Sequence, residues 1–253
     1  MDIRLDGKIA LITGATGGIG SAVANEFFKS GATVIINGRN QEKIDALTDK
    51  LLTGGEKKDA QRIFGITMDL STLDSDINII NRAIEKFKKL DILVNNAAMI
   101  DGRLILRSDA SFVERMMLIN YQIPYQLTRN ALTYMKKGRY GRIINITSIS
   151  GQCGDGGMSA YASSKAAMHA LTQTIAVEYG KYNITANSIA PGIVETSAIK
   201  TMSDEYKQET KKAIPCHRFA QPNEIADLAT FLASERAAYI NGQQIAINGG
   251  WYR

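Results

Sequence analysis

The feature that most constrains the fold of this chain is a glycine-rich turn near the N-terminus, set between a strand signal and a helix signal. Residues 8–13 (KIALIT) form a nearly continuous apolar run, typical of a strand buried on both faces. Residues 21–30 carry apolar side chains at helical spacing. Glycines let the backbone approach a pyrophosphate, and a helix N-terminus offers free N–H groups, so an ordinary glycine turn is the weaker alternative. The candidate contacts to a dinucleotide are Gly14, Thr16, Gly18, Ile19 and Gly20.

Strand and helix signals alternate along the rest of the chain, with no linker rich in Pro or Ser and no repeat. Further strands are predicted at Thr33–Asn37, Ile63–Met68, Ile92–Asn95, Arg142–Thr147, Ile184–Ala190 and Gln244–Ile247. Helices are predicted at Gln41–Leu52, Leu73–Lys88, Ser111–Lys136, Tyr161–Tyr179 and Asn223–Ala233. Such alternation predicts right-handed βαβ crossovers. We therefore expect an α/β fold with one domain over residues 1–253, a Rossmann-type doubly wound parallel sheet of about seven strands with helices on both faces.

One segment, residues 192–219, interrupts this alternation. It contains no strand signal and few strong core residues. Ligands of doubly wound sheets bind at the carboxyl ends of the strands, and a long insertion at that edge usually forms a lid over the site. We expect a substrate lid at 192–219, with surface decoration as the alternative.

The composition of the 253-residue chain narrows the class of protein. Hydrophobic residues make up 45% and charged residues 22%, as in soluble globular proteins, and no apolar run approaches the ~20 residues of a membrane span. The two cysteines, Cys153 and Cys216, lack metal-type spacing and predict free thiols in a reducing, cytoplasmic compartment. With His169 and His217 far apart, no metal site is expected. The net charge of +5 suits acidic ligands, but scattered basic residues argue against nucleic acid.

Tyr161 and Lys165 lie one helical turn apart, and Ser148 precedes the tyrosine by thirteen residues. At this i, i+4 spacing both side chains leave the same face of a helix. A Lys ammonium beside a phenol favours the phenolate, so we expect the pKa of Tyr161 to lie below its usual value of about 10. The phenol would then serve as a proton donor and acceptor near neutral pH.

Together these motifs resemble the short-chain dehydrogenase/reductase family, and the resemblance covers nearly the whole chain. Residues 13–20 match the family's cofactor loop, and residues 95–98 (NNAA) match its Asn-Asn-Ala-Gly strand end, with Ala98 in place of glycine. Residues 191–196 (PGIVET) match the segment that lies against the nicotinamide. The positions of the family's catalytic tetrad are Asn120, Ser148, Tyr161 and Lys165. The resemblance also implies cofactor contacts from Asn96, Val194 and Thr196, and from Tyr161 and Lys165 themselves.

The expected chemistry is the transfer of hydride from a nicotinamide to a carbonyl carbon. Ser148 can donate a hydrogen bond to the carbonyl oxygen, a contact that strengthens as negative charge grows there. Tyr161 then delivers the proton, and Lys165 stabilises the transient phenolate. The resemblance implies that Lys165 also bonds the ribose hydroxyls, and that the backbone carbonyl of Asn120 holds a water that relays protons to the lysine.

Pro124 lies four residues beyond Asn120. Because proline has no N–H, it cannot donate the usual helical hydrogen bond to the carbonyl of Asn120. Our hypothesis is that Pro124 frees this carbonyl for the relay water. A simple kink in a long helix is the alternative.

The choice of cofactor is expected to depend on the end of the second strand. Enzymes that prefer NAD typically carry an acidic residue there, bonded to the ribose 2′-OH. This chain has Gly38 at that place and Arg39 next to it. A guanidinium can pair with a 2′-phosphate through two hydrogen bonds, so NADP(H) is the expected cofactor. Asp69 and Leu70, at the end of the third strand, resemble the pair that flanks the adenine.

Within the family, the chain resembles the 3-oxoacyl-[acyl-carrier-protein] reductases of fatty acid biosynthesis. Residues 154–157 (GDGG) and the tail segments 237–242 and 248–250 carry this resemblance. It implies an NADPH-dependent reduction of a 3-oxoacyl thioester. A reductase of another acyl thioester, such as an acyl-CoA, or of an unrelated small ketone remains an alternative, as does an NADP-binding regulator without catalysis. Cys153 and Met158 lie close to Ser148 and Tyr161 in the sequence. We interpret them as lining the acyl pocket, and the alternative is that they only pack within a loop.

The resemblance also implies partners. Such reductases dock an acidic carrier protein with two arginines near the site, of which one matches Arg139 and the other falls at Tyr182, beside Lys181. The C-terminal tail carries the large apolar side chains Trp251 and Tyr252, which usually signals burial. In the family this end and the helix bearing Asn120 contact other subunits of a tetramer, so a homotetramer is expected. The alternative is that Trp251 folds back onto its own subunit.

Overall fold

The computed structural model describes residues 3–53, 57–72 and 75–252. Its seven strands form one parallel sheet in the order β3-β2-β1-β4-β5-β6-β7. The strands are β1 (Ile9–Ile12), β2 (Thr33–Gly38), β3 (Ile63–Thr67), β4 (Ile92–Asn95), β5 (Gly141–Ile146), β6 (Ile184–Pro191) and β7 (Gln244–Ile247). The strand order reverses between β1 and β4, which is where doubly wound sheets bind dinucleotides.

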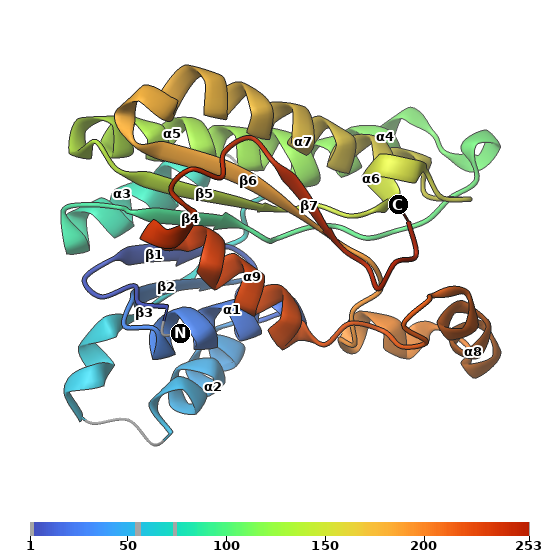
Figure 1. The fold of residues 1–253 in the computed structure, drawn as a ribbon, viewed down its shortest axis with the longest axis horizontal. Coiled ribbons are helices and arrows are strands. Elements are labelled where there is room, and N and C mark those ends of the chain that lie inside the picture. The colour runs from blue at the N-terminus through green and yellow to red at the C-terminus, as the bar shows by residue number, and fades with distance from the viewer. Residues whose placement is uncertain (1–2, 54–56, 73–74, 253) are drawn as a thin grey trace.

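Helices cover both faces of the sheet (Figure 1). One face carries α1 (Gly18–Lys29), α2 (Gln41–Leu52) and α9 (Pro222–Ala233), and the other carries α3 (Ser75–Phe87), α4 (Ala110–Met117), α5 (Ile123–Gly138) and α7 (Ser159–Tyr179). The short helix α6 (Ser150–Cys153) and helix α8 (Asp204–Ala213) lie beyond the carboxyl ends of β5 and β6. The predicted fold class, a Rossmann-type doubly wound sheet, is confirmed.

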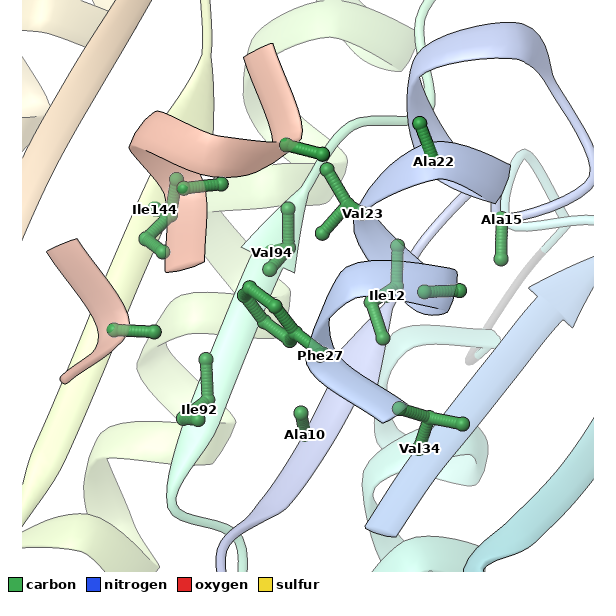
Figure 2. Close-up of a cluster of buried hydrophobic side chains, with 14 of the residues drawn as sticks. Ala10, Ile12, Ala15, Ala22, Val23, Phe27, Val34, Ile92, Val94 and Ile144 are labelled. Atoms are coloured by element: carbon green, nitrogen blue, oxygen red, sulfur yellow. The ribbon is translucent and has the colours of Figure 1, made fainter. Parts of the chain in front are cut away.

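The core lies in two layers, one on each face, because the inner strands are buried on both sides. All residues of β1, β4, β5 and β6 are buried, as a parallel sheet covered on both faces requires. Figure 2 shows the ring of Phe27, on α1, lying against the apolar side chains of β1 and β4, among them Ile12 and Val94. This packing holds the N-terminus of α1, and with it the glycine turn, at the carboxyl edge of the sheet.

The long helix predicted at 111–136 is interrupted in the structure. Helix α4 ends at Met117, a π-helical turn spans Leu118–Gln122, and α5 follows from Ile123. The N–H of Ile123 donates to the carbonyl of Leu118, five residues back. Pro124 explains the break, since it lacks the N–H that would continue the regular helix.

Residues 192–219 contain a helix that the sequence pattern did not predict. Helix α8 is mostly polar, and Thr210 is its only buried residue, so it lacks the broad apolar stripe by which helices are recognised. Backbone hydrogen bonds close the insertion at its base. The N–H of Glu195 donates to the carbonyl of Ala220 at 2.8 Å, and the N–H of Ala220 donates to the carbonyl of Ile193 at 3.0 Å. The helix predicted from Leu73 begins at Ser75 in the structure; Leu73 and Asp74 lie outside the described residues.

Candidate active site

A cleft runs along the carboxyl edge of the sheet. It consists of two adjoining cavities of about 520 and 510 Å³, which share Gly17, Asn96, Ala98 and Ser197 in their walls. The first extends over β2 and β3, and the second extends over β5, β6 and α7. This cleft lies across the point where the strand order reverses, and its length suits a dinucleotide with a substrate beside it.

Three glycines of the turn between β1 and α1 leave little room for a side chain. Gly14 has a φ of +61°, and a Cβ there would lie 2.9 Å from Cα of Ala97. A Cβ on Gly20 would lie 2.4 Å from the carbonyl oxygen of Gly14. At Gly18 the added atom would lie 2.4 Å from Cγ2 of Thr196, which places the two predicted cofactor contacts against each other. These glycines also line the cleft, so the backbone is open to a ligand where α1 begins.

Asn96 fixes this turn to the end of β4. Its side-chain amide donates to the carbonyls of Thr13 at 2.9 Å and Gly14 at 3.1 Å. The Thr13 hydroxyl in turn accepts from the N–H groups of Asn96 at 3.0 Å and Ala97 at 3.1 Å. Asn96 thus lines the cleft and holds its floor rigid.

The first cavity contains the groups predicted for the adenosine half of the cofactor. Arg39, Asp69 and Leu70 all line it. Asp69 accepts hydrogen bonds from the N–H and hydroxyl of Ser71, and these bonds lower the pKa of its carboxyl group. Two further cations in its wall, Lys43 and Arg115, were not predicted. Lys43 follows Arg39 by four residues, a spacing that offered a signal, whereas Arg115 reaches the cavity only through the tertiary fold.

The second cavity brings together Ser148, Tyr161 and Lys165, as the sequence predicts. Ser148 follows β5, and the other two lie on the buried face of α7. The Ser148 side chain is close enough to the Tyr161 hydroxyl to lower its pKa. Lys165 is 4% exposed, and its Nζ donates to the carbonyl of Ile146 at 2.9 Å.

The pKa values of this pair differ from the prediction. Burial raises the pKa of Tyr161 above its usual value, and the nearby Ser148 side chain only partly opposes this. Burial also lowers the pKa of Lys165 to about 8. The predicted lowering of the Tyr161 pKa by its neighbour is therefore wrong for the protein alone. The reason is that desolvation penalises both charged forms, and the ammonium lies 5.7 Å from the centre of the ring.

A buried chain of polar side chains holds α7 against the sheet. The Asn95 amide donates to Asn145 at 2.8 Å, and the Asn145 amide donates to Thr172 of α7 at 2.8 Å. The Thr172 hydroxyl lies 2.7 Å from that of Ser188 on β6. All four residues are buried, so these bonds form in a low-dielectric environment and fix the position of α7.

Asn120 is buried, and its side chain forms hydrogen bonds with neighbouring segments of the chain. Its side chain accepts from the N–H of Met99 at 2.8 Å and donates to the carbonyl of the same residue at 2.9 Å. It also donates to the hydroxyl of Ser164, on the helix that carries Tyr161, at 3.1 Å. The side chain thus joins the π-helical turn, the loop after β4 and α7. The role of its backbone carbonyl in a proton relay stays a prediction.

Val194 and Thr196 line the second cavity, as does Met158, whereas Cys153 is not in its wall. Both cysteines are free. Within the described residues, no group of His, Cys, Asp and Glu side chains could hold a metal ion, and no helix is long and apolar enough to span a membrane. Trp251 lines the second cavity of its own chain, and the predicted contact of this end with another subunit stays a prediction.

Arg139 lies far from these groups within the chain. It precedes β5, whereas Ser148 follows the same strand, so the two lie at opposite edges of the sheet. Six residues of strand separate these edges by about 20 Å. The expectation that the docking arginine lies near the site is therefore wrong for a single chain.

The surroundings of Arg139 form a basic groove of about 680 Å³. Tyr182, which takes the place of the second docking arginine, lies within 5.9 Å of the cationic groups of Lys136, Arg139 and Lys181, measured to the ring centre. The groove is therefore strongly positive although one of the two expected arginines is absent.

Comparison with known proteins agrees with this site. Residues 14–252 match the protein family described as enoyl-(acyl carrier protein) reductase. The chain is 38% identical to the 3-oxoacyl-[acyl-carrier-protein] reductase FabG of Aquifex aeolicus, over all of both chains. It is 36% identical to nodulation protein G of a Rhizobium species, over 98% of each chain. Among solved structures, a candidate gluconate dehydrogenase from Agrobacterium tumefaciens is similar, with a TM-score of 0.93 and 27% identity over 99% of this chain and 98% of that one.

The fold and the cleft define a nicotinamide-dependent oxidoreductase that acts on CH–OH and C=O groups. More particularly, the chain belongs to the short-chain dehydrogenase/reductase family and resembles its 3-oxoacyl-[acyl-carrier-protein] reductases over its full length.

Proposed function

We propose that the protein reduces a 3-oxoacyl thioester with NADPH, in fatty acid biosynthesis. The observation that carries this proposal is the meeting of Ser148, Tyr161 and the buried Lys165 in one cavity, which is otherwise lined mainly by apolar and small residues. Full-length similarity to 3-oxoacyl-[acyl-carrier-protein] reductases supports the thioester. In this proposal residues 1–253 form one NADP-binding domain, 192–219 serves as the substrate lid, and the enzyme works in the cytoplasm.

The proposed roles of the catalytic side chains follow from their positions. The nicotinamide, when bound, supplies the hydride. Ser148 donates a hydrogen bond to the carbonyl oxygen and so stabilises the charge that develops there. Tyr161 keeps its proton at neutral pH, because burial raises its pKa, and delivers it to the same oxygen. Lys165 stabilises the resulting phenolate while it is itself protonated. Asn120 is a positioning residue.

The preference for NADP(H) is supported at the end of β2. Arg39, Lys43 and Arg115 surround the first cavity, where Asp69 is the only carboxylate in the wall among the described residues. A Cβ on Gly38 would lie 2.8 Å from Cγ2 of Thr16. The acidic side chain that NAD-preferring enzymes carry there would therefore displace Thr16. Positive charge and lack of room for a carboxylate both favour a 2′-phosphate.

The pH dependence of catalysis should report Lys165. Its pKa is lowered by burial to about 8, so the ammonium is present below that pH and is lost as pH rises through it. We expect kcat/KM for the reduced cofactor, which reports groups of the free enzyme, to fall above about pH 8. Tyr161 cannot cause this fall, because its pKa is raised. In Lys165→Arg the guanidinium stays charged at this pH, so the residual activity of the variant should not fall near pH 8. If the variant showed the same fall as the wild type, the fall would have to be assigned to another group.

The function is tested by steady-state kinetics with one 3-oxoacyl group presented on acyl carrier protein, on coenzyme A and on N-acetylcysteamine. We expect turnover with all three and the highest kcat/KM with the carrier protein. Turnover of small ketones without turnover of any thioester would favour the alternative of a small-ketone reductase. Binding of NADPH without turnover of either class would favour a regulator.

An acyl carrier protein is the proposed partner, docked at the basic groove around Arg139. Its acidic surface would be attracted there by the positive charge. Because Arg139 lies at the opposite edge of the sheet from Ser148, the carrier must deliver its acyl group to a second copy of the chain. The docking proposal therefore depends on the proposed homotetramer.

Charge reversal at the groove should separate carrier from small substrates. We expect Arg139→Glu to raise KM several-fold for an acyl-carrier-protein substrate and to leave KM for the N-acetylcysteamine thioester nearly unchanged, because the small thioester needs only the pocket. Lys29→Glu, at the exposed end of α1, changes the net charge equally and serves as the control. The difference in KM for the acyl-carrier-protein substrate between Arg139→Glu and the wild type should shrink at high salt. If Arg139→Glu changed the two KM values equally, or changed neither, the carrier protein would have to dock outside this groove.

A further inference from the structure

The C-terminal tail forms part of the second cavity. After β7 the chain turns sharply through Asn248, Gly249 and Gly250, and both glycines have positive φ values, of +63° and +83°. Side chains at these glycines would not fit, since a Cβ would lie 2.9 Å from Ile214 at the first and 3.2 Å from Pro215 at the second. The turn thus rests directly on the segment that follows α8.

Hydrogen bonds fix the tail on both sides. The N–H of Cys216 donates to the carbonyl of Gly249 at 3.2 Å, and the N–H of Gly192, at the end of β6, donates to that of Ile247 at 3.1 Å. The Asn248 side chain donates to the carbonyl of Tyr252 at 2.8 Å. Trp251, which this turn presents, is therefore held in a defined position in the cavity wall.

The other end of helix α8 contributes to the same cavity. Ser203 caps the helix by accepting from the N–H of Tyr206 at 3.2 Å, and the cavity wall includes Met202 and Tyr206 together with Trp251. The only charged residues in that wall, among those the structure describes, are Lys165 and Asp155. Lys165 is committed to the proposed chemistry, and Asp155 comes from the segment before α7, so the part of the wall formed by Met202, Tyr206 and Trp251 carries no charge.

We propose that Trp251, with Met202 and Tyr206, binds the apolar chain of the substrate beyond the reacting carbonyl and so sets the preference for chain length. This inference rests on the proposed function and names the part of the substrate that the lid and tail recognise. A large indole face, a thioether and a phenol ring offer apolar contact to methylene groups. The amides of a pantetheine arm would instead need hydrogen-bond partners, which this surface offers only at its phenol and indole tips.

The kinetic test uses 3-oxoacyl N-acetylcysteamine thioesters of four and eight acyl carbons. Each methylene withdrawn from water contributes a factor of about four, so Trp251→Ala should raise KM for the eight-carbon substrate at least ~10-fold relative to the four-carbon one. Trp251→Phe should recover most of this difference. Tyr252→Ala is the matched control, since Tyr252 is 40% exposed and lies outside the cavity wall. The proposal would be overturned if the ratio of the eight-carbon KM to the four-carbon KM in Trp251→Ala were the same as in the wild type, or lower than in the wild type.

A second measurement is independent of turnover. Trp251 is the only tryptophan of the chain, so its fluorescence reports contact at this position alone. Titration of the wild type with 2-octanone, in the presence of the cofactor, should change the emission saturably, whereas 2-butanone should change it much less. If no thioester is turned over but 2-octanone changes the emission, the proposed function fails and the binding surface stands. An emission that 2-octanone leaves unchanged would overturn the surface even in an enzyme that reduces thioesters.

Discussion

Tyr161→Phe should lower turnover by at least ~10²-fold while cofactor binding survives, the low end of what general acid–base catalysis contributes. The substitution removes only the hydroxyl. The ring stays packed, because Tyr161 is 7% exposed and belongs to a buried cluster with Phe112 and Met116. What is lost is the proposed proton donor and its interaction with Ser148.

Two measurements check this result. Steady-state turnover gives the loss in kcat, and a cofactor titration gives the Kd, which should match the wild type. Ser148→Ala is the companion variant, since it removes the other half of the pair and should also lower kcat. Retention of more than a tenth of wild-type turnover in Tyr161→Phe would remove Tyr161 from the mechanism.

The sheet could be predicted because a parallel sheet covered on both faces leaves a strong signal. Strands such as β1 (IALI) and β4 (ILVN) read as short apolar runs, and every residue in them is buried. The helices that pack on the sheet carry apolar stripes, as α1 does with Val23 and Phe27. Helix α8 has no such stripe, and its sequence signals are instead the Ser203 cap, an acidic first turn and a basic last turn, which the prediction from apolar spacing did not use.

The candidate site was predictable where local motifs determine it. The glycine turn, Ser148, Tyr161 and Lys165 meet at the carboxyl edge because each follows or faces a strand end. Lys165 shows the limit of that reasoning. The spacing between Lys165 and Tyr161 predicts that the two side chains share a helix face, but it does not show that both are buried away from solvent. Burial, a tertiary property, reverses the expected direction of the Tyr161 pKa.

Two positions show how topology adds what motifs omit. Arg139 and Ser148 lie on either side of β5, so their separation could have been read from the predicted strand, although resemblance to the family suggested proximity. Trp251 is the opposite case. It enters the cavity through a turn that depends on contacts with residues 214–216, and no local pattern predicts such contacts.

Arg39→Ala should erase most of the preference for NADPH over NADH. A hydrogen bond to a charged group contributes about 1.5–3 kcal/mol, and we expect the lower part of this range because Arg39 is exposed and screened by solvent. Affinity for NADH should barely change, since that cofactor has no 2′-phosphate. Calorimetric titration of wild type and variant with both cofactors gives the four affinities needed.

The neighbouring cations provide the controls. Lys43→Ala removes a second positive charge from the same cavity and should reduce the NADPH preference less than Arg39→Ala does, because an ammonium cannot form the paired hydrogen bonds of a guanidinium. Arg39→Lys should accordingly fall between Arg39→Ala and the wild type. If the wild type instead bound both cofactors equally, Gly38 and Arg39 would not determine the choice, and the positive charge around the first cavity would serve the phosphates that both cofactors share.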